Sequence, residues 1–300
     1  MGVTREGTRA RHRSLLTGSG GTAEVWLDHT SSRVVLQTAH KTARGGGSGS
    51  SNWDKCALPN CLGARLPNEP RCLGHAAPEI RASYYEWLLS RQTSPLLFTG
   101  MVIEQALWDE ALHALTRGQP EVPIPVFCIA SVFPFQLRLA AMRFSQHVSF
   151  HAASFDAGSE ISQCRFSDLD LSYADFDDAV AVIRDCGIDR SLTASFVHMD
   201  RDRQHVAFVE CDVGGEARFN GFSGDLRLDK CRISGDLILS EASVTHLSLV
   251  GSTLGGQLDA EDLNAGSIVG RHATFESAVT AGLVRVPFQL GGTADLADSK

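Results

Sequence analysis

A five-residue hydrophobic period is the feature of this 300-residue sequence that most restricts its fold. Between residues 226 and 254, large apolar residues recur at steps of five with one step of six, and a second residue on the same face, small or leucine, stands two positions before each of them. A helix needs apolar residues at steps of three and four, and a strand needs strict alternation. Positions i and i−2 lie on one face of an extended segment, so a corner in each unit must restore the phase. Short extended segments joined by regular corners predict a solenoid.

The same period occurs upstream, where Ile161, Phe166, Leu171 and Phe176 follow one another at steps of five. About 160 residues at roughly 20 per coil predict about eight coils. An antiparallel sandwich is the alternative, but it predicts turn signals every 8–12 residues rather than every five. The residues that we expect to point into the coil are Phe150, Phe155, Phe166, Phe176, Leu239, Leu249 and Leu254.

Two stretches, CRFSDLDLSYADF (Cys164 to Phe176) and residues 226–263, resemble the pentapeptide-repeat family, whose unit is A-(D/N)-L-x-x with Phe or Leu at its centre. The resemblance covers roughly residues 127–288. It implies a mainly β fold, a right-handed quadrilateral β-helix with about four units per coil. The segment RCLGHAAPEIRASYYEWL resembles the part that precedes the repeats in actinobacterial members, where a cysteine-rich start and two helices come first.

The composition along the chain suggests four parts. We expect residues 1–52 to be a disordered arm and linker, because KTARGGGSGSSN is typical of a flexible linker. The arm contains two apolar segments, AEVWL and RVVLQ, that can pair weakly. We expect residues 53–76, which contain three cysteines and a histidine that are described below, to form a zinc-binding element, residues 77–120 to contain two helices, and residues 121–300 to form the coil. We expect helices from Pro78 to near Arg91 and over residues 101–117, with Thr99 as the N-cap of the second. The second helix should cover the apolar end of the solenoid.

A Cys/His cluster is the best candidate for a functional site. Cys56 and Cys61 form a C-x4-C pair, and Cys72 and His75 form a C-x2-H pair ten residues later. Thiolate and imidazole ligands suit Zn²⁺, and four protein ligands indicate one structural ion rather than a catalytic one. The alternative is three ordinary thiols and a surface histidine. The other five cysteines are expected to fill small interior positions; they are Cys128, Cys164, Cys186, Cys211 and Cys231.

Acidic residues suggest a possible partner surface on the outer faces of the coil. One group is Asp168, Asp170, Asp175, Asp177 and Asp178, and a second, in a segment that interrupts the repeat, is Asp200, Arg201, Asp202 and Arg203. The resemblance implies one use for such a face, since members of the quinolone-resistance type mimic duplex DNA to engage gyrase. The alternatives are a solvated face and a tolerated insertion.

Charge and motifs restrict the function. The net charge is −8, and residues 126–300 carry 24 acidic against 14 basic residues, so we expect no direct binding of nucleic acid by the coil. No apolar run is long enough to span a bilayer and the start lacks a signal-peptide pattern, so we expect a cytoplasmic protein that does not bind membranes. No nucleophile triad, phosphate loop or nucleotide motif occurs, so we assign no catalytic residue.

The leading hypothesis is a non-enzymatic scaffold that binds a protein partner. One alternative is an acidic DNA mimic that binds or protects a type II topoisomerase. Another is a β-helical enzyme or biosynthetic accessory protein that uses a cleft on a side face. A continuous acidic stripe would favour mimicry, whereas a pocket lined by two or more carboxylates would favour catalysis.

Overall fold

The structure is a computed structural model that describes residues 54–176, 180–197 and 205–277 with their side chains, together with the backbone of five further strands. The chain forms two compact units, residues 1–72 and 73–300.

The first unit contains a small antiparallel sheet of β1 (Arg11–Gly18), β2 (Gly21–Asp28) and β3 (Arg33–Ala39). The prediction of a disordered arm over residues 1–52 did not include this sheet. The two apolar segments AEVWL and RVVLQ lie in β2 and β3, which pair with each other. Residues 40–53, which contain the linker sequence, lie outside the described residues.

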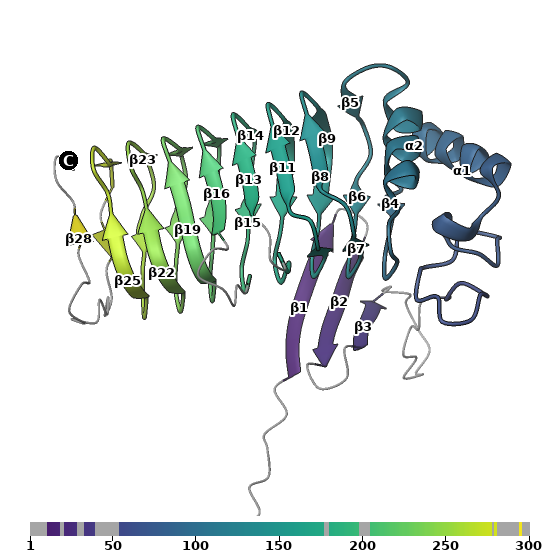
Figure 1. The fold of residues 1–300 in the computed structure, drawn as a ribbon, viewed down its shortest axis with the longest axis horizontal. Coiled ribbons are helices and arrows are strands. Elements are labelled where there is room, and N and C mark those ends of the chain that lie inside the picture. Colours follow the sequence, from purple (N-terminus) through teal and green to yellow (C-terminus); the bar gives the residue numbers. More distant parts are fainter. Residues whose placement is uncertain are drawn as a thin grey trace, which may run out of the picture. The chain divides into compact units, whose positions relative to one another are not determined.

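The second unit is a parallel β-solenoid (Figure 1). Each full coil contains four short extended segments, and the segments at the same position in successive coils form one wall. We number these walls 1 to 4. Wall 1 is an eight-stranded parallel sheet. Its strands are β8 (Leu137–Ala140), β11 (Ser159–Ser162), β13 (Ala181–Arg184), β16 (His205–Val209), β19 (Ser223–Asp229), β22 (Ser243–Ser248), β25 (Asn264–Val269) and β28 (Ala294–Asp295).

Walls 2 and 3 share two long strands, β9 (Arg143–Ser149) and β12 (Arg165–Asp170), which run through the corner between them. The other strands of wall 2 are β5 (Glu121–Val122), β14 (Gly187–Ile188), β17 (Asp212–Val213), β20 (Arg232–Ile233), β23 (Thr253–Leu254) and β26 (Thr274–Phe275). Those of wall 3 are β4 (Leu96–Leu97), β6 (Val126–Phe127), β15 (Leu192–Thr193), β18 (Ala217–Arg218), β21 (Leu237–Ile238), β24 (Leu258–Asp259) and β27 (Val279–Thr280).

Wall 4 is the shortest side of each coil. It contains β7 (Val132–Phe133), β10 (Ser154–Phe155), the bridges of Val102 with Val132 and of Ser154 with Asp175, and the first residues of β19, β22 and β25. The pairing of every wall with the same wall of the next coil is parallel, as the solenoid prediction requires. The antiparallel sandwich is therefore wrong for these residues.

The coils differ in length. On wall 1, Leu137 pairs with Ser159 and Ser159 with Ala181, so these two coils are equally long and slightly exceed four five-residue units. The next coil, from Ala181 to Val206, is longer, and the following one, from Val206 to Leu226, has the length of four such units. The predicted coil of four units therefore holds only in the C-terminal part of the solenoid. The longest coil contains the segment that was predicted to interrupt the repeat.

Two of the four corners in each coil use a residue with left-handed backbone conformation. At one corner these residues are Ala130, Ala152, Tyr173, Phe196, Gly221, Glu241 and Asp262, and at the other they are Ala141, Gln163, Asp185, Glu210, Lys230, Gly251 and His272. For twelve of these fourteen residues, those from Ala130 to Gly251, the amide N–H donates to the carbonyl that precedes the corresponding residue of the next coil, for example Gln163 to Arg184 at 3.0 Å. Along the chain, one or the other of these two corners occurs about every second five-residue unit. Non-glycine residues adopt this conformation at some cost in energy, which the ladder of hydrogen bonds offsets.

The interior of the solenoid is filled with apolar side chains. All seven residues predicted to point inward are buried. Rings in neighbouring coils stack on one another: Phe144 on Phe166 with centroids 5.1 Å apart, and Phe155 on Phe176 at 4.9 Å. The stacking follows from the repeat, because an inward position in one coil lies directly above the same position in the next.

Two helices precede the complete coils and lie at the N-terminal end of the solenoid (Figure 1). Helix α1 (Pro78–Arg91) has the predicted bounds. Helix α2 (Gln105–Thr116) has Glu104 as its N-cap, so the prediction of Thr99 as the cap was wrong. The start predicted at residue 101 was also early, because Val102 bridges to Val132 and the Ile103 amide donates to the Val132 carbonyl.

Helix α2 covers the end of the solenoid through Trp108. Its ring lies 5.6 Å from that of Phe98, 5.6 Å from that of Phe133 and 6.5 Å from that of Phe150. Trp108 is 2% exposed, so the apolar end of the first coil is closed by this side chain. The predicted role of the second helix as a cap is thus visible in its contacts.

Candidate metal centre

The first two cysteines of the cluster lie on a tight irregular hairpin. Lys55 forms an antiparallel bridge with Ala64, and Arg65 forms one with Cys72. The Cys56 amide donates to the Gly63 carbonyl at 3.0 Å, which closes the loop that carries Cys61. Asn60 takes a left-handed conformation inside this loop, with a φ of 64°. Such turns bring Cys56, Cys61 and Cys72 together although they are not neighbours in the sequence.

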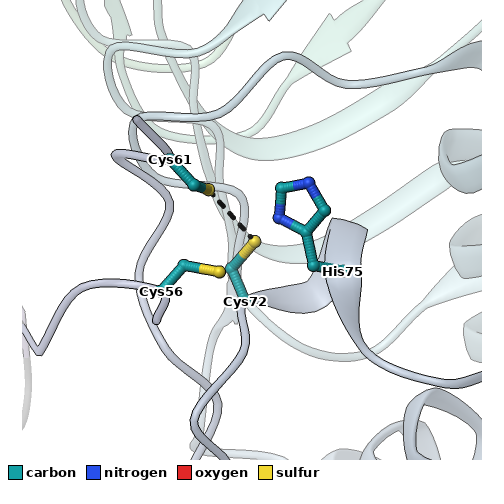
Figure 2. A group of neighbouring side chains, drawn as sticks. All are labelled: Cys56, Cys61, Cys72 and His75. Carbon is teal, nitrogen blue, oxygen red and sulfur yellow. Dashed lines mark hydrogen bonds between the residues drawn. The ribbon is translucent and has the colours of Figure 1, made fainter. Parts of the chain in front are cut away.

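His75 joins the cysteines because a short 3-10 helix, η1 (Leu73–His75), begins directly after Cys72. Residues three apart lie on the same side of a 3-10 turn, so the C-x2-H spacing places the imidazole beside the thiol. Figure 2 shows the four side chains directed toward a common centre. All four residues that the sequence analysis selected are therefore brought together.

The distances between the side chains fit a tetrahedral metal ion. The ligand atoms of the four residues all lie within 4.8 Å of one another, and the Cys61 and Cys72 sulfurs are 3.6 Å apart. Two sulfurs that are each about 2.3 Å from a zinc ion at a tetrahedral angle are separated by roughly 3.8 Å. A Cys3His cluster of this size can hold a metal ion.

Gly63 is a part of this site that the sequence analysis missed. Its amide N–H lies 3.4 Å from the Cys61 sulfur and donates to it. A Cβ atom at this position would lie 2.9 Å from the Cys72 sulfur and 3.4 Å from the Cys61 sulfur, which is too close for a side chain. The signal in the sequence was the short C-L-G run, since a glycine two residues after a ligand allows the backbone to approach the sulfurs.

The Cys72 thiol is costly to ionise without a cation beside it. Burial, together with the neighbouring thiols of Cys61 and Cys56, raises the pKa of Cys72 to about 12. A divalent cation reverses this effect, because it binds the thiolate form and releases the proton. Cys56 and Cys72 are buried, Cys61 is half-buried and His75 is exposed, and this group could hold a metal ion.

The acidic residues proposed as a partner surface do not all lie on the outside. Asp168 and Asp170 are 8% and 7% exposed, so the expectation that they lie on an accessible outer face was wrong. Asp170 accepts hydrogen bonds from the Ser149 hydroxyl at 3.0 Å and from the Ser172 amide at 2.9 Å, and its carboxylate lies 3.7 Å from Nδ1 of His151.

Asp168 is held in a similar way. It forms an ion pair with Arg190 and accepts a hydrogen bond from the Ser191 hydroxyl at 2.9 Å, and both partners lie in the next coil. Alternation along β12 turns these two carboxylates away from the interior, but their neighbours bury them. Asp175 is exposed. The remaining residues of the predicted surface lie outside the described residues; they are Asp177, Asp178, Asp200, Arg201, Asp202 and Arg203.

No family model, curated protein or solved structure among those compared with the chain matches it. In the part of the chain that the structure describes, no helix has the length and apolar character needed to cross a bilayer.

Proposed function

We propose that this protein is a non-enzymatic scaffold for protein–protein interaction, built on a pentapeptide-repeat β-helix and stabilised near its N-terminus by one structural zinc ion. The observation that carries the proposal is the filled interior of the solenoid. Because rings and aliphatic side chains occupy the inward positions, recognition has to use the outer walls. A stacked array of short strands presents such walls as long, regular surfaces, which is how repeat proteins bind partners.

Three features support the resemblance to the pentapeptide-repeat family. Each full coil has four sides, the inward face carries pairs of buried residues at i and i−2, and the C-terminal coils are close to four five-residue units long. The right-handed sense of the coil is part of the same proposal. The coils between Leu137 and Val206 depart from the strict repeat, because each contains two or more residues beyond four five-residue units.

Zinc is the proposed ion because the ligands are three thiolates and one imidazole. This set selects soft or borderline ions, and zinc is the commonest ion in closed tetrahedral sites. The proposed ligands are Cys56, Cys61, Cys72 and His75. The ion would hold a segment that has few buried apolar side chains of its own.

The pattern of charges favours the scaffold over the DNA mimic. Ion pairs join successive coils across the outer surface, including Arg165 with Asp189 at 2.7 Å and Lys230 with Glu210 at 2.8 Å. A phosphate mimic needs a continuous negative stripe, because each interposed cation repels the basic groove that it must enter. In this solenoid, acidic and basic side chains of neighbouring coils partly neutralise each other's charge. The enzymatic alternative is disfavoured because Asp168 and Asp170, the two buried carboxylates of β12, are each engaged by their own partners.

Two assays with the full chain separate these functions. In a supercoiling assay with the host type II topoisomerase, we expect no inhibition at low micromolar protein. Inhibition that is lost on changing Asp175, Asp177 and Asp178 to Asn would favour the DNA mimic instead.

The second assay is affinity capture from the native host's lysate, with a charge-matched unrelated protein as the control bait. We expect a saturable protein partner that the control bait does not retain. Capture of nucleic acid alone, or of the same proteins by both baits, would contradict the scaffold proposal.

A further inference from the structure

Four cysteines form a column inside the solenoid, one in each of four successive coils. We call Cys164, Cys186, Cys211 and Cys231 the cysteine ladder. Each follows a left-handed corner residue directly, and each is 2–3% exposed. The amide of the next residue in each following coil donates to a ladder carbonyl, for example Gly187 to Cys164 at 2.9 Å, so the four residues lie one above another.

Packing at these positions requires a small side chain but not sulfur. The column continues with Ser252 and Ala273 in the next two coils, and both are 1% exposed. The Cys231 amide donates to the Ser252 hydroxyl at 2.9 Å, in the same way that the Cys164 amide donates to the Cys186 sulfur at 3.4 Å. A small side chain is therefore sufficient for the fold, and the ladder adds a continuous row of thiols.

The sulfur of Cys186 both accepts and donates hydrogen bonds. The Cys164 amide N–H of the preceding coil donates to the Cys186 sulfur at 3.4 Å, and such a bond stabilises a thiolate. In the protonated form, each thiol donates to the carbonyl two residues earlier, for example Cys186 to Arg184 at 3.1 Å. That carbonyl also accepts an amide from the neighbouring coil, Gln163 to Arg184 at 3.0 Å. When the Cys186 thiol loses its proton, the Arg184 carbonyl therefore still has the Gln163 amide as a hydrogen-bond donor.

Burial opposes ionisation. The pKa values of Cys186 and Cys211 are raised to about 12, with hydrogen bonds to neighbouring ladder thiols and burial among the causes. A monovalent cation that replaces the protons of two thiols lowers this penalty, because the pair of thiolates then carries one net negative charge instead of two.

We propose that the cysteine ladder binds soft monovalent cations of the Cu(I) class, each held between the thiolates of two neighbouring coils. Soft thiolate ligands select Cu(I). Parallel strands lie about 4.7–4.9 Å apart, so sulfurs in register are spaced for one ion between two of them. Each ion displaces two S–H protons, which are released to water, and no electron is transferred. The four thiols provide sites for two ions. This inference does not depend on the scaffold proposal or on the zinc centre.

The test is Cu(I) binding to the full chain against a chromophoric Cu(I) chelator under reducing, oxygen-free conditions. Wild type is compared with a variant that carries Cys186→Ala and Cys211→Ala, which removes one thiol from each pair. Alanine and serine both occupy this column elsewhere, so the variant should fold, and a Cys186→Ser, Cys211→Ser version provides a second check by circular dichroism. Cys128→Ala is the matched control, because Cys128 is fully buried but outside the ladder.

We expect wild type and Cys128→Ala to bind about two more Cu(I) ions per chain than either ladder variant, since two thiolates hold each ion. The N-terminal cluster is present in all four proteins, so its own copper binding cancels. Because the ladder is buried, the measurement is made on native protein and on protein refolded with Cu(I). Equal copper contents in wild type and the ladder variants under both conditions would overturn the proposal.

Discussion

At Asp170 the fold holds a carboxylate that is 7% exposed and still has a lowered pKa. Burial alone would raise the pKa, but hydrogen bonding and charge attraction from His151 outweigh it, with help from Ser172. A lowered pKa in the folded state means that this group stabilises the protein above the unfolded pKa of about 3.9. That contribution is lost as the pH falls through the folded value.

Asp170→Asn should lower the free energy of unfolding at pH 7 by about 1–3 kcal/mol, because the single amide oxygen cannot replace both carboxylate oxygens that accept from Ser149 and Ser172. The variant should also lose less stability than wild type on acidification below about pH 4, because one acid-sensitive group is gone. Urea unfolding at a series of pH values measures both effects. Asp189→Asn is the control: this carboxylate is 39% exposed beside Arg165, so its removal should cost about 1 kcal/mol or less. Equal stability of Asp170→Asn and wild type at pH 7 would contradict the account.

Gly63 allows a second test at the scale of one residue. Gly63→Ala places a methyl group 2.9 Å from the Cys72 sulfur. We therefore expect zinc affinity to fall by about tenfold or more, as when the surroundings of metal ligands are disturbed. Competition with a chromophoric zinc chelator measures the affinity. Gly187→Ala is the control, since the nearest atom to its Cβ is 3.7 Å away. Unchanged affinity in Gly63→Ala would show that the sulfurs are not as close as the structure has them.

The corners illustrate what the sequence could reveal about single elements. The five-residue period predicts that corners exist, because the inward and outward alternation of side chains has to be reset in each unit of five residues. It does not predict which residue becomes left-handed, since the ones used include Ala, Gln, Phe and Lys as well as Gly and Asp. Their conformation is imposed by hydrogen bonds to the next coil, which overrule local preference, so no residue type marks the position.

Glycine substitutions at Glu241 and Glu261 test whether the fold imposes the left-handed conformation. Glu241 is left-handed with a φ of 59°, whereas Glu261 is not among the residues with positive φ, and both side chains are exposed. Glu241→Gly should raise the free energy of unfolding by about 0.5–1 kcal/mol, because glycine removes the strain. Glu261→Gly should lower it by a similar amount, since glycine there only adds freedom to the unfolded chain. Thermal or urea unfolding gives the two signs, and a loss of stability in both variants would refute the role assigned to the corner.

Helix α2 acts at the scale of an element through the Trp108 ring. Trp108→Ala removes a fully buried ring from the end of the solenoid and should cost about 3–5 kcal/mol. Trp87→Ala is the matched control, because Trp87 is only half-buried and contacts Tyr84 and Arg91 on α1. We expect about 1 kcal/mol or less for that change. Similar losses for the two tryptophans in equilibrium unfolding would mean that α2 is not the cap.

For the whole molecule, the sequence predicted the parts that depend on local repetition. The parallel coil, the inward positions and the bounds of α1 follow from periods and caps that lie within a few residues. The burial of Asp168 and Asp170 could not be predicted, because it depends on which residues of the neighbouring coils meet them: Arg190 and Ser191 belong to the coil after Asp168. Gly63 was missed for the same reason, since the sulfur that excludes a side chain belongs to Cys72.

The convergence of four ligands on one ion is the claim that links the sequence to the site most directly. Cys56, Cys61, Cys72 and His75 were selected by spacing alone, and their side chains meet within 4.8 Å. The direct measurement is the metal content of the full chain purified without added zinc, by elemental mass spectrometry, next to Cys61→Ser and Cys128→Ser. The account predicts about one zinc per chain for wild type and Cys128→Ser, and about none for Cys61→Ser, because three ligands cannot close the site. Wild-type protein with a zinc content near zero, or Cys61→Ser protein with undiminished zinc, would contradict it.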